Sequence, residues 1–81
     1  MYNKMDVLEP PEYKVYAMRG CPYCIKALNL LKKKKKNYSV YYLDGKKYHD
    51  FKKKYGQEAT VPRIYKNGNL LGGSEELESQ L

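Results

Sequence analysis

Short runs of aromatic and branched residues alternate along the chain with stretches of helical periodicity. The aromatic and branched runs predict four strands. They lie at Tyr13–Ala17, Tyr38–Leu43, Arg63–Lys66 and Asn69–Leu71. Asn67-Gly68, between the last two runs, is a strong hairpin signal, so these two strands should pair antiparallel.

Three helices are predicted between and after these strands. Pro22 suits a first helical position, and Ile25, Leu28 and Leu31 recur at helical spacing as an inward stripe. The lysine run 32–36 closes this helix. A second helix over residues 49–55 should stop at Gly56, and Ser74 should cap a last helix over residues 75–81.

The resulting order is β-α-β-α-β-β-α, which belongs to the α/β class. The first βαβ unit should pair its strands in parallel through a right-handed crossover, giving a mixed four-stranded sheet flanked by helices. Pro10-Pro11 separates a flexible lead-in over residues 1–12 from one domain over residues 13–81.

Composition narrows the class of protein further. The chain has 81 residues, a mean hydropathy of −0.85 and a net charge of +7. No apolar run approaches the roughly 18 residues of a membrane span, so we expect a cytoplasmic protein without membrane contact. The positive charge favours anionic partners without identifying them. We expect the run Lys32–Lys36 to be a solvated helix end rather than a specific binding surface.

The chain has two cysteines, Cys21 and Cys24, three positions apart. A bridge across so short a loop constrains the unfolded chain little, so the pair indicates redox or metal chemistry. His49 is the only other strong zinc ligand, which is too few for a closed four-ligand site. We therefore expect no metal site, and we interpret His49 as a surface residue.

The position of the pair favours redox chemistry. Cys21 should be the N-cap of the first helix, where unpaired N–H groups and the helix dipole stabilise a thiolate, and Arg19 adds positive charge. Cys24 lies one turn on, within reach of a disulfide. We expect Cys21 to attack a disulfide and Cys24 to resolve the mixed disulfide.

Three short segments together resemble the dithiol glutaredoxin family. They are Cys21-Pro22-Tyr23-Cys24, Thr60-Val61-Pro62 and Gly72-Gly73-Ser74-Glu75-Glu76. Their order and spacing fit the family over residues 13–81. The resemblance implies a thioredoxin-like fold and a glutathione-dependent enzyme that reduces protein disulfides and glutathione mixed disulfides.

The resemblance also implies the partners. Glutathione would be a cosubstrate, with no tightly bound cofactor, and the protein partners would carry disulfides or glutathione adducts, ribonucleotide reductase among them. A monomer without specific nucleic-acid binding is implied.

The family assigns roles around the cysteines. The residue matching Pro62 is cis there, and the backbone of Val61, between Thr60 and Pro62, would pair with the substrate's cysteine. Tyr23 would line the glutathione groove, and Gln57 would lie near the glycyl carboxylate.

The γ-glutamyl end of glutathione would lie at Gly73, Ser74 and Glu75. Here the chain departs from the family, because Glu75 and Glu76 replace the usual Asp. Met18 also stands where a basic residue is usual, and Arg19 is expected to substitute for it.

Three alternatives remain open at this stage. The first is a glutaredoxin-like electron donor that a thioredoxin-type reductase recharges. The second is an iron–sulfur carrier built from Cys21 of two monomers and two glutathiones, against which Pro22 argues. The third is a basic nucleic-acid-binding module, whose salt-sensitive binding would survive loss of both cysteines.

Overall fold

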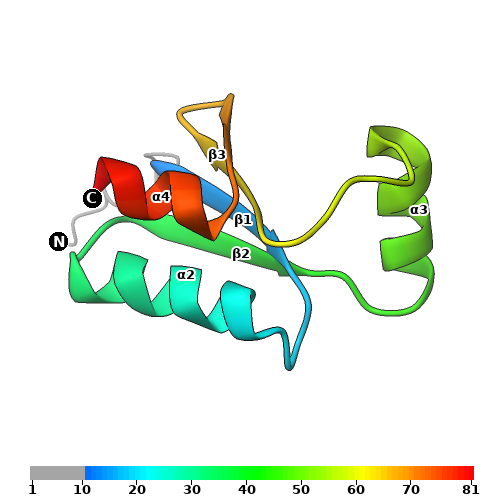
Figure 1. Ribbon diagram of the computed structural model, residues 1–81, viewed down its shortest axis with the longest axis horizontal. Helices are drawn as coiled ribbons and strands as arrows, with labels where there is room; N and C mark the ends of the chain where they lie inside the picture. Colours follow the sequence, from blue (N-terminus) through cyan, green and yellow to red (C-terminus); the bar gives the residue numbers. More distant parts are fainter. Residues whose placement is uncertain (1–10) are drawn as a thin grey trace, which may run out of the picture.

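The computed structural model describes residues 11–81, so most of the lead-in predicted over residues 1–12 lies outside the described residues. Seven elements follow in the predicted order (Figure 1): β1 (Tyr13–Ala17), α2 (Pro22–Lys33), β2 (Tyr38–Tyr42), α3 (Lys46–Tyr55), β3 (Arg63–Lys66), β4 (Asn69–Gly72) and α4 (Ser74–Gln80).

The four strands form one mixed sheet in the order β2-β1-β3-β4. β1 pairs with β2 in parallel, with Val15 opposite Val40, and with β3 antiparallel, with Val15 opposite Ile64. β3 and β4 form the predicted antiparallel hairpin. The α/β class and the mixed sheet are therefore confirmed.

One face of the sheet carries the main core. α2 and α4 lie side by side on this face (Figure 1) and pack against inward side chains of β1 and β3. The fully enclosed members of the core are Tyr13, Val15, Ala17, Cys24, Ala27, Leu31, Ile64 and Leu77. The second cysteine is thus a core residue as well as a candidate for chemistry.

α3 lies beyond the ends of the strands in Figure 1, rather than over the middle of the sheet. Its Phe51 packs with Leu43 and Ala59 in a second, smaller core cluster. This cluster holds α3 and the segment after it, and that segment leads into β3.

The inward face of α2 differs from the predicted stripe. Cys24, Ala27 and Leu31 are buried, Leu28 packs against them in part, and Ile25 is 50% exposed. Each helical residue turns about 100° from its neighbour, so a face centred on Cys24 turns Ile25 away from the core. The prediction for Ile25 was wrong because the stripe starts at the cysteine.

Several predicted boundaries also move. α3 begins earlier, at Lys46 behind Gly45, whose φ is 53°, a value that favours glycine. α2 ends at Lys33, so the lysine run continues beyond the helix. β2 ends one residue early at Tyr42, and β4 continues through Gly72.

The cap of α4 differs in kind from the prediction. Gly73 is the N-cap, and Ser74 is the buried first helical residue. The Glu76 side chain accepts a hydrogen bond from the Gly73 N–H at 2.7 Å. A carboxylate from the first turn therefore does the capping that was predicted for the Ser74 hydroxyl.

Tyr13 offers a test of the core. Its side chain is fully buried, and its hydroxyl oxygen has no hydrogen-bond partner among the described residues. Removing a buried polar group that lacks a partner relieves a desolvation cost. We expect Tyr13→Phe to keep or raise the free energy of unfolding, measured by urea denaturation. A loss above about 1 kcal/mol would show that the hydroxyl makes a stabilising bond.

None of the helices within residues 11–81 combines the length and the apolar character needed to cross a lipid bilayer.

Candidate active site

The two cysteines lie at the start of α2, directly after the turn that connects β1 to this helix. The chain turns at Arg19-Gly20, with Gly20 at a φ of 80°, and Cys21 then takes the N-cap position with extended backbone. The Cys24 N–H donates a hydrogen bond to Cys21 Sγ at 3.3 Å. Cys21 Sγ therefore faces the start of α2, as the sequence predicted, where backbone donors and the helix dipole stabilise an anion.

The two thiols have different surroundings. Both are free, but Cys21 is half-buried and Cys24 is only 1% exposed. Burial, and after it the side-chain hydrogen bond with Cys21, raise the pKa of the Cys24 thiol to about 12. Cys24 therefore keeps its proton at neutral pH. Cys21 is the more accessible sulfur, and it faces the backbone N–H groups at the start of α2.

The segment entering β3 forms a second wall near the cysteines. The Val61–Pro62 peptide bond is cis, as predicted from the family. Val61 packs against the same core cluster as Cys21, while Pro62 is buried. A Cβ on Gly73 would lie 3.5 Å from the Pro62 carbonyl oxygen, at ordinary van der Waals distance, so the start of α4 approaches Pro62 closely.

This close approach brings three predicted site residues together. Thr60, Pro62 and Gly73 line one hollow of about 360 Å³. Glu76 also lines it, and the Gly73 N–H holds the pKa of the Glu76 carboxyl below its usual range. Sequence reasoning treated Glu76 only as a departure from the family; the glutamate three residues beyond a helix start was the available signal.

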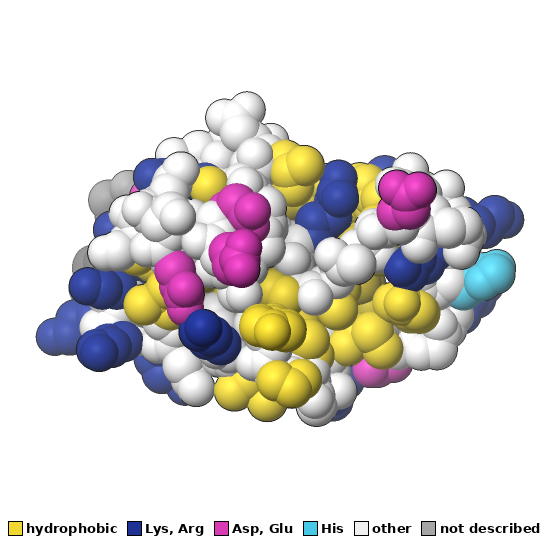
Figure 2. Space-filling view, in the orientation of Figure 1, with side chains coloured by type: hydrophobic (Ala, Val, Ile, Leu, Met, Phe, Trp, Pro, Cys, Tyr) yellow, Lys and Arg dark blue, Asp and Glu magenta, His cyan; other side chains and the backbone are white. Residues whose placement is uncertain are grey.

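Three further predicted site residues lie in the first turns of α2 and α4. Tyr23 is 62% exposed on the first turn of α2, Ile25 is 50% exposed two residues later, and Figure 2 shows apolar side chains gathered over that end of α2. On α4, Ser74 is buried and Glu75 is exposed. Tyr23 and Glu75 thus present side chains to solvent, while Ser74 does not.

Arg19 and Gln57 lie toward α3. The Arg19 guanidinium pairs with Asp44 at 2.5 Å, and it stacks over the Tyr42 ring, 4.4 Å from the centroid. Gln57 follows α3, and its carbonyl accepts a hydrogen bond from Lys52 Nζ at 2.9 Å. Sequence reasoning missed the Asp44 partner of Arg19, because their pairing depends on the parallel register of β1 and β2.

His49 is exposed on α3, as predicted. Within residues 11–81, the structure places no three side chains of His, Cys, Asp or Glu together where they could hold a metal ion.

Comparisons with known proteins agree with this arrangement. The family profile described as Glutaredoxin matches residues 13–71. Glutaredoxin 1 of Rickettsia prowazekii is 39% identical over 66 residues, which cover 78% of this chain and 70% of that protein. The mitochondrial glutaredoxin-2 of Bos taurus is 36% identical over 76% of this chain but only 42% of its own length. The chain thus spans about two fifths of that longer relative.

Solved structures share the fold. The dithiolic glutaredoxin 2-C-Grx1 of Trypanosoma brucei brucei is 30% identical with a TM-score of 0.71, covering 98% of this chain and 86% of that one. A buckwheat glutaredoxin, solved as a complex with glutathione, is 20% identical with a TM-score of 0.72, covering 86% and 67%. These structures have the thioredoxin-like fold that the sequence predicts. The site, the family profile and the relatives agree, and the chain belongs to the glutaredoxin family, with Cys21 and Cys24 as its dithiol pair.

Proposed function

We propose that this chain is a glutathione-dependent thiol–disulfide oxidoreductase that works through Cys21 and Cys24. The arrangement of the two sulfurs carries the proposal. Cys21 Sγ faces the helix N-terminus, and the buried Cys24 donates its N–H to that sulfur at 3.3 Å. One thiol is therefore placed to attack, and the other is kept protonated behind it.

The first step breaks the disulfide of the substrate. The Cys21 thiolate attacks one substrate sulfur, the S–S bond breaks, and the other sulfur leaves as a thiolate that takes a proton from solvent. Cys21 then holds half of the substrate as a mixed disulfide. Backbone donors at the start of α2 stabilise the negative charge on sulfur before the attack.

The second step releases the bound half by one of two routes. With a protein substrate, Cys24 gives up its proton and attacks Cys21 Sγ, which frees the substrate thiol and leaves a Cys21–Cys24 disulfide. With a bound glutathione, the thiolate of a second glutathione attacks the sulfur of the bound one instead. Glutathione disulfide forms, the bond to Cys21 breaks, and Cys21 leaves as the reduced thiolate. Two glutathiones likewise return the Cys21–Cys24 disulfide to the dithiol.

We place glutathione along the wall that Thr60, Val61 and Pro62 form, with Tyr23 exposed beside Cys21. The Val61 backbone would pair with the cysteine of glutathione. Because Val61 and Cys21 pack on the same core cluster, the core fixes their relative position. The glutathione complex of the buckwheat relative supports this ligand.

The γ-glutamyl end would lie at Gly73, Ser74 and Glu75. Glu76 already accepts the Gly73 N–H, so a glutathione carboxylate reaching that donor would have to displace the Glu76 side chain. Glu75 is exposed and free to meet the glutathione ammonium group.

Arg19 is proposed to meet the glycyl carboxylate, with Gln57 nearby. Its pair with Asp44 is exposed on both sides, at 65% and 62% of the side chains. Exposed ion pairs contribute less than about 1 kcal/mol, so Arg19 can exchange Asp44 for a ligand carboxylate at little cost.

If Arg19 exchanges the Asp44 carboxylate for that of glutathione, substitutions of Arg19 and Asp44 should change the KM for a glutathionylated substrate differently. Arg19→Ala should raise the KM for a glutathionylated substrate about two- to fivefold, and Asp44→Asn should leave it unchanged or lower it.

Replacing Lys33, Lys34 and Lys35 together by alanine should act only through long-range attraction. This attraction vanishes near 0.5 M salt, where the screening length is about 4 Å. The measurement is KM at low and high salt. A lysine effect that persists while the Arg19 effect disappears would move the glutathione site to the lysine run.

A coupled assay tests the proposed activity. It contains glutathione, glutathione reductase, NADPH and a small glutathione mixed disulfide, and NADPH oxidation should depend on the protein. When a thioredoxin-type reductase replaces both glutathione and glutathione reductase, the protein should not support NADPH oxidation. Turnover only with that reductase would favour the electron-donor alternative.

We further propose that the protein acts as a cytoplasmic monomer on disulfide-containing or glutathionylated proteins. The low number of cysteines, two rather than the four or more of a disulfide framework, supports a reducing compartment. Absorbance and brown colour after anaerobic purification with glutathione would instead indicate the cluster-carrying alternative.

A further inference from the structure

The sheet face opposite α2 and α4 carries a row of tyrosines. Strand side chains alternate between faces, so the positions next to the buried residues of β1 point to this face. They are Lys14 and Tyr16, and the register places Tyr41 of β2 opposite Tyr16 and Tyr65 of β3 opposite Lys14. We call Tyr16, Tyr41, Tyr65 and the neighbouring Tyr55 of α3 the tyrosine face.

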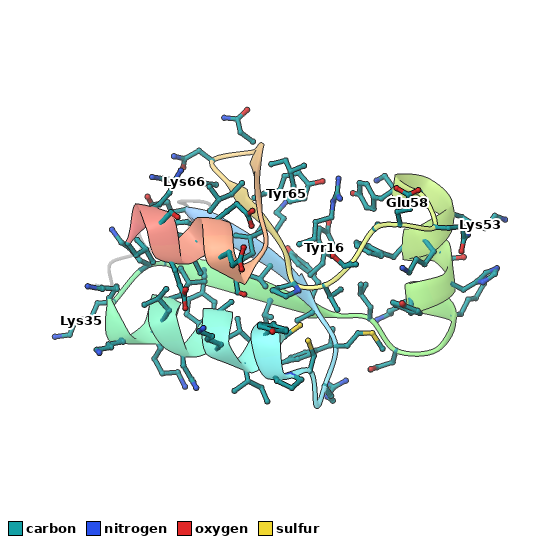
Figure 3. All side chains as sticks on the ribbon, in the orientation of Figure 1. Tyr16, Lys35, Lys53, Glu58, Tyr65 and Lys66 are labelled. Atoms are coloured by element: carbon teal, nitrogen blue, oxygen red, sulfur yellow. The ribbon has the colours of Figure 1, made fainter. Side chains whose placement is uncertain are left out.

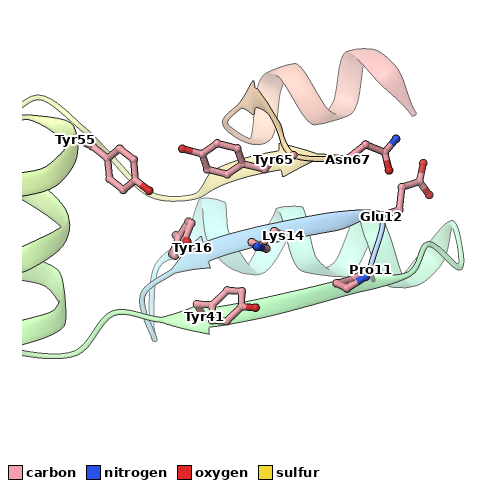
Figure 4. A pocket seen from close by; sticks show the side chains of 9 residues that line it. Pro11, Glu12, Lys14, Tyr16, Tyr41, Tyr55, Tyr65 and Asn67 are labelled. Carbon is pink, nitrogen blue, oxygen red and sulfur yellow. The ribbon is translucent and has the colours of Figure 1, made fainter. Parts of the chain in front are cut away.

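The four rings stand close enough to form one aromatic platform, although their planes are not parallel: Tyr41 and Tyr65 lie at 32° and 82° to Tyr16. The ring centroid of Tyr16 lies 5.5 Å from that of Tyr41, 6.1 Å from that of Tyr65 and 6.4 Å from that of Tyr55. Figure 3 shows Tyr16 and Tyr65 at the end of the sheet nearer to α3. The rings and Lys14 line a hollow of about 670 Å³ (Figure 4), larger than the hollow beside Pro62.

Cations frame the platform. Lys14 Nζ lies 6.0 Å from the Tyr41 centroid, and the Arg63 guanidinium lies 4.2 Å from the Tyr55 centroid. Arg63 Nε also donates to the Tyr65 hydroxyl at 3.1 Å, which fixes both side chains. The four described strands contain no Asp or Glu, and Glu12 is the one carboxylate that lines the hollow.

We infer that the tyrosine face binds single-stranded nucleic acid, with bases stacked on Tyr16, Tyr41 and Tyr65 and phosphates held by Lys14 and Arg63. Aromatic side chains on adjacent strands of a four-stranded sheet stack successive bases, and flanking cations follow the phosphate backbone.

Charge supports the same ligand over a longer range. The chain carries a net charge of +7, and basic residues lie at both ends of the molecule: Lys35 near the end of α2 and Lys53 on α3 (Figure 3). A polyanionic strand crossing the sheet between them would pass Lys14 and Arg63, with Glu12 as the one carboxylate that lines the hollow. Such binding reads no base edges and is therefore tolerant of sequence, and it needs neither cysteine.

Fluorescence anisotropy with a labelled twelve-residue oligothymidylate tests the inference on the full chain. Tyr41 is the most exposed ring of the face, at 45%, so its loss should disturb the fold least. Tyr41→Ala should raise Kd at least about fivefold and Tyr41→Leu should do the same, whereas Tyr41→Phe should bind like the parent. Disulfide reduction by all three variants should be unchanged, which shows that they are folded.

Lys14→Ala and Lys34→Ala form a matched pair that separates contact from net charge. Both remove one exposed lysine, but Lys34 lies at the end of α2, away from the face. Lys14→Ala should lower the slope of log Kd against log salt by about 0.7 more than Lys34→Ala does.

Four outcomes would overturn the inference: no binding at low salt, equal effects of the two lysine variants, tight binding by Tyr41→Leu, or preference for a duplex of the same sequence. Absence of oligonucleotide binding together with a change of oligomeric state in Tyr41→Ala, measured by sedimentation, would assign the face to a second copy of the chain. Because the readout does not involve thiols, failure here leaves the proposed reductase activity intact.

Discussion

Cys21→Ser is expected to abolish every disulfide-exchange activity of this protein, by at least about 10³-fold. Cys24→Ser is expected to keep the reduction of glutathione mixed disulfides and to lose the reduction of protein disulfides. The reason is the division of roles between the two sulfurs. Attack on a mixed disulfide and release by external glutathione use Cys21 alone, whereas a protein disulfide has to be resolved from within by Cys24.

Two substrates measured with the same variants check this division. One is a small glutathione mixed disulfide, and the other is a protein with a single accessible disulfide. Serine keeps the size of the side chain, so Cys24→Ser should remain folded; Cys24→Ala is a second variant without a buried hydroxyl. If Cys24→Ser lost both activities as fully as Cys21→Ser, the proposed release by external glutathione would be wrong.

Alkylation of the reduced protein should modify Cys21 at least about 100-fold faster than Cys24 at pH 7. Thiolates are the nucleophiles, and burial together with the side-chain hydrogen bond that the protonated Cys24 makes with Cys21 raises the pKa of Cys24 to about 12. At pH 7 only about one Cys24 side chain in 10⁵ is then a thiolate, against about 3% for an ordinary thiol. With its side chain 1% exposed, Cys24 is also shielded from the reagent.

The pH dependence follows from the direction of this pKa. A thiol with a raised pKa gains thiolate as the pH rises, so labelling of Cys24 should increase about tenfold per pH unit up to roughly pH 12. The measurement is mass spectrometry of the peptides after a short pulse of iodoacetamide between pH 6 and 9. Equal labelling at pH 7, or faster labelling at Cys24, would reverse the roles of the two cysteines.

Local sequence signals predicted the frame of the fold and the attacking cysteine. The strand before Gly20, the proline at the first helical position and the Asn67-Gly68 hairpin each act within a few residues. They placed Cys21 at a helix start, where the structure has it. The family resemblance supplied the cis bond before Pro62, which no local pattern indicates.

The features that the sequence did not reveal depend on contacts between distant elements. Arg19 meets Asp44 only because β1 and β2 run in parallel and end at the same side of the sheet. Ile25 is exposed because the face of α2 turned toward the sheet is centred on Cys24. The sequence places both Glu75 and Glu76 in the first turn of α4, and only the structure shows that Glu76 is the one that caps the helix.

The tyrosine face illustrates the same limit. Tyr16, Tyr41 and Tyr65 lie in three separate strands, and the alternation within each strand does not say which strands are neighbours. The order β2-β1-β3-β4 places the three rings side by side. Ten tyrosines in the sequence gave no reason to single out these three.

The central claim is that Cys21 forms the mixed disulfide with glutathione. Intact-mass and peptide mass spectrometry of Cys24→Ser after incubation with glutathione disulfide test it most directly. The account predicts one glutathione per chain, attached to Cys21 and removed by free glutathione. No adduct on Cys21 in the folded Cys24→Ser protein would contradict it.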